Sequence, residues 1–120
     1  MPAHILLVED DPLARNLFRE VLSRDGYEVS EAADGDQALD LVRAQRFDLM
    51  VSDLVMPKMD GLKLVQQVHS TYPRMPIIFV TGYLSAIPGQ AILQDMAEII
   101  LKPVDLDVFR STVQRLLRSC

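Results

Sequence analysis

The sequence predicts an α/β fold in which a doubly wound, five-stranded parallel sheet carries helices on both faces. Short apolar runs alternate along the chain with segments whose apolar residues recur every three or four positions. The short runs are typical of buried strands, and the longer repeat is typical of helices that pack on a sheet. A regular strand–helix alternation of this kind favours parallel strands joined by right-handed crossovers.

Five strand-like runs rich in Ile, Val, Leu or Phe lie near residues 4–8, 27–31, 48–53, 76–81 and 98–101. Between the first two runs, apolar residues at three- and four-residue spacing predict one helix face, made of Leu13, Leu17, Phe18, Val21 and Leu22. Gly26 closes this helix in the manner of a C-cap glycine.

Three further helices fill most of the remaining gaps. Asp34, with Gln37 three residues later, resembles a capping box at the start of the second one. The predicted apolar faces are Ala38, Leu41 and Val42, then Leu62, Leu64, Val65 and Val68, and last Val108, Phe109, Val113, Leu116 and Leu117. The stretch 82–97 is the least regular, because Pro88-Gly89 interrupts any helix there, so that a helix can begin only near Pro88.

Composition limits the classes of function. With 120 residues, of which 49% are apolar, we expect residues 1–120 to form a single domain with a sizeable core. The formal net charge of −5, without a basic cluster, argues against direct nucleic acid binding and against an anionic membrane surface. No apolar stretch approaches the roughly 18 residues of a membrane span. The single cysteine, Cys120, favours a reducing, cytoplasmic location.

Charged or hydroxyl side chains stand where four of the apolar runs end. Acids at 9–11 follow the first run, Asp53 ends the third, Thr81 ends the fourth and Lys102 follows the fifth. In open parallel sheets, ligands bind outside the carboxyl ends of the strands. We therefore expect these residues to converge on one site.

The acids among them suggest a metal site. Asp10, Asp11 and Asp53 would bring two or three carboxylates together, and their mutual repulsion favours a cation. Mg²⁺ prefers about six oxygens and keeps several waters, so these acids and the backbone carbonyl of Val55 would form part of its cage. Asp11 before Pro12 can also be read as an ordinary helix N-cap. Both interpretations hold if Asp11 caps the helix while Asp10 binds the metal.

Thr81 and Lys102 add a hydroxyl and a cation to the same edge. Taken singly, a threonine often just ends a strand and a lysine often just solvates its ammonium. Beside acids, the two could bind the oxygens of a phosphoryl group, whose transfer depends on positioning and charge stabilisation. A carboxylate can itself be the nucleophile, which would make Asp53 the site of an aspartyl phosphate.

Together these segments resemble the receiver domain of two-component response regulators, over the whole length of the chain. The matching segments are residues 5–11, 53–61, 81–82 and 102–103. Each is weakly specific alone, but in this order and at these spacings they are highly specific. The resemblance implies a flavodoxin-like sheet of order 2-1-3-4-5, the order found in the family's chemotaxis regulator.

The resemblance also implies a mechanism. Asp53 would accept a phosphoryl group from the phosphohistidine of a sensor histidine kinase or phosphotransfer protein, and a change of conformation would then alter binding to a downstream effector. The implied Mg²⁺ ligands are Asp10, Asp11, Asp53 and the carbonyl of Val55. Thr81 and Lys102 would hold the phosphoryl oxygens, and the Lys102–Pro103 peptide bond would be cis. Such a domain promotes its own phosphorylation and dephosphorylation without being a dedicated enzyme.

The sequence departs from the family pattern in two places. Ile99 stands where the family usually has an aromatic residue, often tyrosine, whose rotation is coupled to movement of the threonine. Pro88-Gly89 falls where the family has a regular fourth helix, next to a face through which many members dimerise. The aromatic half of the switch and that dimer are therefore not expected here, and the oligomeric state stays open.

Two other functions compete with this interpretation. A phosphatase or hydrolase with an aspartyl nucleophile usually has a second acid two positions after the first, where this chain has Val55. A degenerate receiver would bind partners without phosphorylation, but the set of Asp53, Thr81 and Lys102 is complete. A free-standing regulator and a segment of a hybrid kinase or DNA-binding regulator both fit the sequence.

Overall fold

A computed structural model describes residues 2–53, 61–82 and 97–118. Within these ranges one sheet contains β1 (His4–Val8), β2 (Glu28–Ala32), β3 (Leu49–Asp53), β4 (Ile77–Thr81) and β5 (Glu98–Leu101). Neighbouring strands are all parallel, in the order β2-β1-β3-β4-β5. Both the doubly wound parallel sheet and its order 2-1-3-4-5 are thus confirmed.

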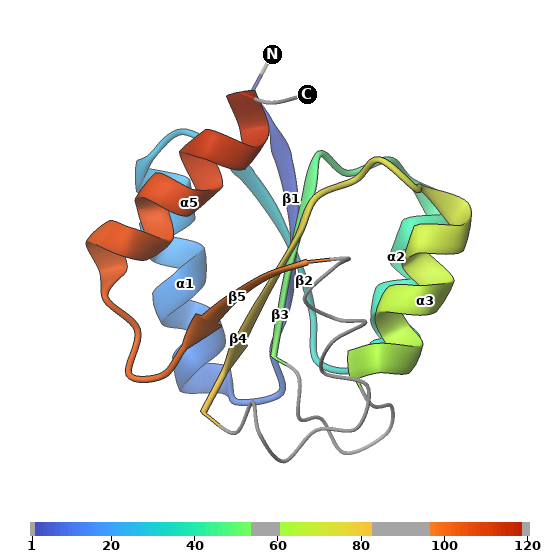
Figure 1. Ribbon diagram of the computed structural model, residues 1–120, viewed down its shortest axis with the longest axis horizontal. Coiled ribbons are helices and arrows are strands. Elements are labelled where there is room, and N and C mark those ends of the chain that lie inside the picture. The colour runs from blue at the N-terminus through green and yellow to red at the C-terminus, as the bar shows by residue number, and fades with distance from the viewer. Residues whose placement is uncertain (1, 54–60, 83–96, 119–120) are drawn as a thin grey trace.

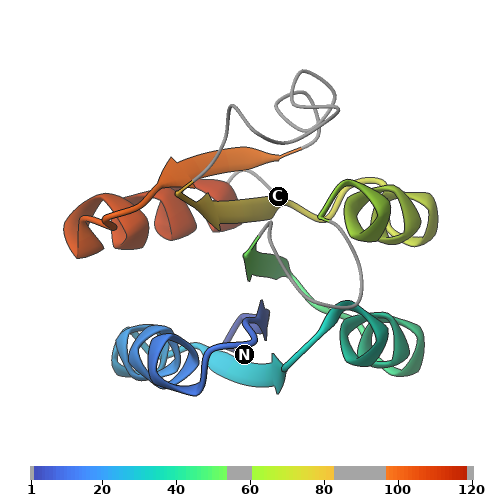
Figure 2. The same ribbon diagram turned by 90° about the horizontal axis from the view of Figure 1, so that it is seen from below.

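Helices cover both faces of this sheet, as Figures 1 and 2 show. One face carries α1 (Pro12–Arg24) and α5 (Leu106–Arg118), and the other carries α2 (Gly35–Ala44) and α3 (Gly61–Thr71). None of the described helices is long and apolar enough to cross a membrane. The predicted irregularity around Pro88-Gly89 lies outside the described residues.

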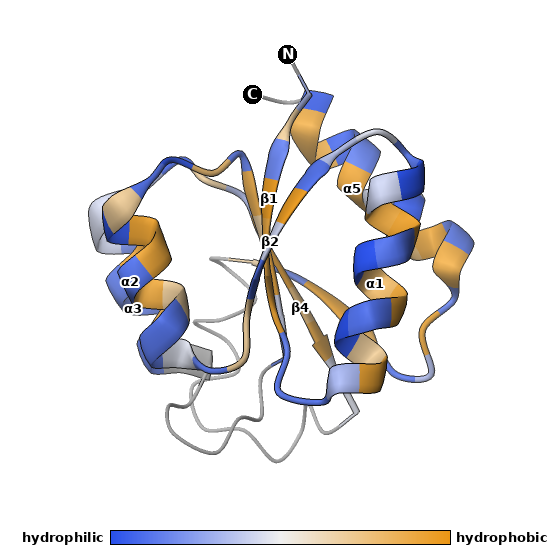
Figure 3. Cartoon of the chain, turned by 180° about the vertical axis from the view of Figure 1, so that it is seen from behind, coloured by the Kyte–Doolittle hydropathy of each residue, from blue (hydrophilic) through white to orange (hydrophobic). Residues whose placement is uncertain are grey.

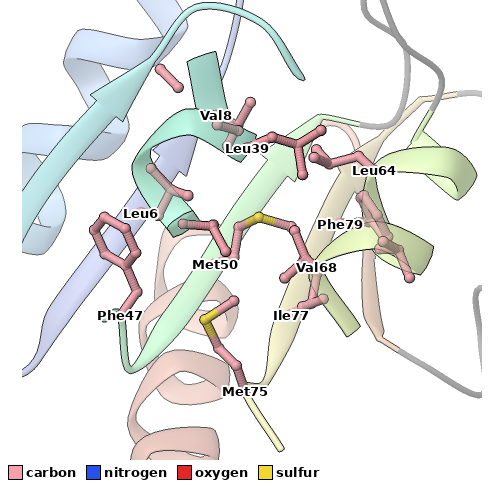
Figure 4. Packing of buried hydrophobic residues seen from close by; sticks show 14 residues of the cluster. Leu6, Val8, Leu39, Phe47, Met50, Leu64, Val68, Met75, Ile77 and Phe79 are labelled. Atoms are coloured by element: carbon pink, nitrogen blue, oxygen red, sulfur yellow. The ribbon is translucent and has the colours of Figure 1, made fainter. Parts of the chain in front are cut away.

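Two apolar clusters hold the helices to the sheet because successive strand residues point to opposite faces. In β1, Leu6 and Val8 belong to the cluster under α2 and α3, and Ile5 and Leu7 belong to the cluster under α1 and α5. Figure 4 shows the first cluster, in which side chains from the strands meet those of the two helices. Figure 3 shows the expected contrast between mostly apolar central strands and helices that alternate apolar and hydrophilic residues.

The predicted helix ends are confirmed. Gly26 follows the C-cap of α1 with φ of +94°, a conformation that side-chain-bearing residues rarely adopt. Asp34 caps α2 by accepting the backbone N–H of Gln37 at 2.9 Å. The Gln37 side chain accepts the N–H of Ala33 at 2.9 Å, one residue before the cap itself, so the capping box is a variant of the usual one.

The predicted single face of α1 is wrong in part. Phe18 and Leu22 are buried, but Leu13 is 83% exposed and Leu17 is 48% exposed. Leu13 and Leu22 lie nine residues apart, which is two and a half turns of a helix with about 3.6 residues per turn. They therefore point to opposite sides, and only the half of α1 that contains Phe18 and Leu22 can face the sheet.

Candidate functional site

The carboxyl ends of the strands lie at the lower edge of the sheet in Figure 1. Four of the residues that carry the predicted site stand at these strand ends. Asp53 is the last residue of β3 and Thr81 the last of β4, while Glu9 directly follows β1 and Lys102 directly follows β5. Asp53 is 8% exposed, Glu9 4% and Thr81 0%. Polar groups buried to this extent need hydrogen-bond or charge partners.

Lys102 is a partner of Asp53. Its Nζ donates to Asp53 Oδ2 at 3.1 Å, and its backbone N–H donates to the carbonyl of Thr81 at 2.8 Å. Burial acts to lower the pKa of Lys102, but the hydrogen bond to Asp53 and the charges of Asp53, Glu9 and Asp10 raise it above its ordinary value. The ammonium is therefore held as a cation beside Asp53 while the side chain stays 40% exposed, so it is accessible to an incoming anion.

Three carboxylates lie close together at this edge. Ligand oxygens of Glu9, Asp10 and Asp53 all lie within 4.8 Å of one another. Burial of Glu9 and then the charge of Asp53 raise the pKa of Glu9 from 4.5 to about 7, and the charge of Lys102 only partly offsets this. Asp10 is exposed, so the cluster is accessible from solvent.

Glu9, rather than Asp11, completes this cluster. Asp11 is exposed and caps α1, where its Oδ1 accepts the backbone N–H of Leu13 at 3.1 Å. The prediction that Asp11 lies with Asp10 and Asp53 is thus wrong, because capping turns its carboxylate toward the helix backbone. The sequence did contain a signal: once Asp11 and Pro12 are taken as a helix start, Glu9 and Asp10 are the acids left at the strand end.

The other predicted site residues fall into place to different degrees. Thr81 is fully buried at the end of β4, and Val55 lies outside the described residues. The Lys102–Pro103 peptide bond is cis, as the resemblance implied. Ile99 is partly buried, pairs with Phe79 across β4 and β5, and packs against the cluster under α2 and α3. An aliphatic side chain thus fills the position at which the family usually has an aromatic ring.

The donor set fits a hard divalent cation. Carboxylate oxygens are the ligands that Mg²⁺ prefers, and a site with a few protein oxygens leaves room for its waters. Without a cation, Glu9 is costly to ionise beside Asp53, as its raised pKa reflects. A bound cation would favour the ionised form of both carboxylates, and Lys102 supplies only one positive charge to a cluster of three acids.

Comparison with known proteins agrees with this geometry. Residues 5–114 match the family model of the response regulator receiver domain. The chain is 40% identical over 119 residues to the response regulator MprA of Mycolicibacterium vanbaalenii, covering 98% of this chain and 52% of MprA. It therefore spans about half the length of this curated relative.

Solved structures give the same result. A CheY-like response regulator receiver domain protein from Methanospirillum hungatei superposes with a TM-score of 0.91 at 30% identity, over 99% of this chain and 96% of that one. The response regulator TrrA from Thermotoga maritima, solved in complex with Mg²⁺–BeF, superposes with a TM-score of 0.86 at 29% identity, over 97% of this chain and 99% of TrrA. From its fold, its matched residues and these relatives, the chain belongs to the receiver domain family of two-component response regulators.

Proposed function

We propose that residues 1–120 form a single receiver domain in which Asp53 accepts a phosphoryl group from the phosphohistidine of a sensor histidine kinase or phosphotransfer protein. The observation that supports this best is the setting of Asp53. It is a nearly buried carboxylate at a strand end, with the Lys102 ammonium at 3.1 Å and two further acids around it. A surface aspartate with no such neighbours could not stabilise the charge of a phosphoryl group.

In the proposed step an oxygen of Asp53 attacks phosphorus. The new P–O bond forms as the P–N bond to the donor imidazole breaks, and the electron pair of that bond returns to the imidazole nitrogen. Bound Mg²⁺ would neutralise charge on the carboxylates and on the transferred group. Glu9, Asp10 and Asp53 would hold the cation, together with the carbonyl of Val55.

Lys102 and Thr81 would bind the oxygens of the phosphoryl group once it is attached to Asp53. The Lys102 ammonium now donates to Asp53 Oδ2, and its partial exposure allows it to donate to a phosphoryl oxygen instead. The backbone bond to Thr81 at 2.8 Å keeps the two strand ends together, so their side chains can act on the same group. The conformational change would begin when the hydrogen bond donated by Lys102 moves from the Asp53 carboxylate to an oxygen of the phosphoryl group.

This proposal accounts for the residues better than its two rivals. A phosphatase with an aspartyl nucleophile usually has a second acid, two residues after the first, that protonates the leaving group. In this chain that position is Val55, whose side chain cannot donate a proton. A receiver that works without phosphorylation would not need a lysine bound to a nearly buried aspartate. We infer a signalling domain of the cytoplasm, rather than a dedicated enzyme. A free-standing regulator and a segment of a hybrid kinase or DNA-binding regulator both fit its residues, and its effector and oligomeric state stay open.

Mapping of the modified residue tests the proposal. The protein is incubated with Mg²⁺ and a phosphohistidine-bearing donor, and the acyl phosphate is then reduced with borohydride, which converts a phosphorylated aspartate to homoserine. We expect homoserine at position 53 alone. Homoserine at another aspartate, or steady hydrolysis of a generic phosphomonoester without incorporation, would contradict the proposal.

A further inference from the structure

Arg15 of α1 contacts the backbone of the cluster formed by Glu9, Asp10 and Asp53 without being one of its acids. Its Nη1 donates to the backbone carbonyl of Glu9 at 2.9 Å. On its other side, Nε lies 3.7 Å from Oε1 of Glu31, a residue of β2, and the Arg15 side chain is only 25% exposed. A guanidinium is a rigid planar fork, so an anion on one side fixes the direction in which its other N–H groups donate.

The carbonyl that Arg15 holds lies between two acids of the cluster. It belongs to the planar peptide unit that joins Glu9 to Asp10. The orientation of this plane influences the directions in which the side chains of Glu9 and Asp10 leave the backbone. The N–H of Glu9 donates to the carbonyl of Ala32 at 3.0 Å, just beyond the β1–β2 pairing. The Glu9 backbone is therefore held by β2 at its N–H and by Arg15 at its carbonyl.

We propose that Arg15 is a positioning residue for the metal site, which acts by orienting the Glu9–Asp10 peptide and so aims two carboxylates at the cation. This inference rests on the proposed function, because it assigns Arg15 a role toward the cation that Glu9, Asp10 and Asp53 would bind. Groups that orient metal ligands without touching the metal typically change its affinity about 10–100-fold when they are removed.

Arg19 provides a matched control one turn further along α1. Its Nε lies 3.6 Å from the same Oε1 of Glu31, so it carries the same charge to the same partner. Within the part of the chain that the structure describes, its side-chain hydrogen bond goes to Asn16 of its own helix and not to Glu9. Removing Arg19 therefore removes a positive charge near Glu31 without releasing the Glu9 carbonyl.

The test is metal binding by the unphosphorylated protein, measured for Mg²⁺ by calorimetry and for Mn²⁺ by the spin resonance of the free ion. We expect Arg15→Gln to weaken binding about tenfold and Arg19→Gln to weaken it by at most about twofold, the effect of a screened surface charge. Arg15→Lys, which keeps the charge but loses the planar fork, should lie between wild type and Arg15→Gln. Amide hydrogen exchange at Asp10 and Asp11 should speed up in Arg15→Gln and not in Arg19→Gln.

Phosphorylation by acetyl phosphate gives an independent readout. A positioning defect raises the Mg²⁺ concentration needed for half-maximal rate while the rate at saturating Mg²⁺ recovers, whereas simple unfolding lowers the amplitude at every concentration. Equal metal affinity of wild type and Arg15→Gln, or an equal loss in Arg19→Gln, would overturn the inference and leave the proposed function intact. If Arg15→Gln does not fold, Arg15→Lys decides in its place, and affinity no lower than that of Arg19→Gln refutes the role. A wild type that binds neither metal would overturn the proposed function and the inference together.

Discussion

Replacement of Glu9 by glutamine should change how the stability of the metal-free protein depends on pH. Glu9 is 4% exposed, and its pKa rises from 4.5 to about 7 on folding. Between these values the folded state binds a proton that the unfolded state has released, so stability falls as pH rises through this window. The stabilising contribution of the protonated form is present at low pH and is lost by the time the pH has passed about 7.

The size of the effect follows from the two pKa values. The rise of the pKa of Glu9 from 4.5 to about 7 corresponds to about 3 kcal/mol, and most of it is lost between pH 5 and pH 8. Glutamine has the shape of the protonated acid and does not titrate. The free energy of unfolding of the wild type should therefore drop by about 2–3 kcal/mol more than that of Glu9→Gln over this range.

Urea denaturation followed by circular dichroism, near pH 5 and near pH 8 with a chelator present, measures this difference. The other titratable groups are common to both proteins, so their contributions cancel in the comparison. Addition of Mg²⁺ should remove much of the loss at pH 8 in the wild type, because a cation stabilises the ionised Glu9. A difference between wild type and Glu9→Gln that is the same at both pH values would refute the account of Glu9 as a buried, charge-crowded acid.

Three further changes test other parts of the account. Asp10→Asn should weaken Mg²⁺ binding in a titration and leave the unfolding free energy of the apoprotein unchanged or raised, since it removes one of three mutually repelling charges; unaltered affinity would remove Asp10 from the site. Phe109→Ala should cost about 3–5 kcal/mol in chemical denaturation, because the ring is 0% exposed and packs 5.1 Å, centroid to centroid, from that of Phe18; a loss below about 1 kcal/mol would mean that the core under α1 and α5 is loosely packed. Gly82→Ala should fold normally, because the nearest atom to the added methyl group is Lys102 Cβ at 3.9 Å. The methyl group should narrow the access of water to Asp53 and so lengthen the lifetime of the phosphorylated form. Faster decay of the phosphorylated form after the donor is removed would contradict this.

The sheet and most helix ends follow from local chemistry that the sequence displays. Asp34 and Gln37 are close in sequence, and their hydrogen bond marks the start of α2. Gly26 marks the end of α1, because its positive φ is a conformation that other residues rarely adopt. The order of the strands does not follow from local pattern, because hydrophobic runs do not encode their neighbours. It was predicted only through the resemblance to receiver domains, whose spacing of Asp53, Thr81 and Lys102 matches this chain.

The errors at the site have a common physical origin. Three consecutive acids at 9–11 look alike in a sequence, and their roles differ only because the chain turns from strand to helix between them. Asp11 caps α1 by accepting the backbone N–H of Leu13. Glu9 lies buried directly after β1. Arg15 was not singled out because its two partners, the Glu9 carbonyl and Glu31, become neighbours only when β2 pairs with β1.

The central claim is that Asp53 is the single phosphoacceptor and that it needs a divalent cation. Intact-mass measurement after incubation with acetyl phosphate tests it most directly, on wild type, on Asp53→Asn and on Asp40→Asn, which changes an exposed aspartate of α2 as a control. We expect wild type and Asp40→Asn to gain the mass of one phosphoryl group with Mg²⁺ and none with a chelator, and Asp53→Asn to gain none in either condition. Equal labelling of Asp53→Asn, or full labelling of the wild type in the chelator, would contradict the claim.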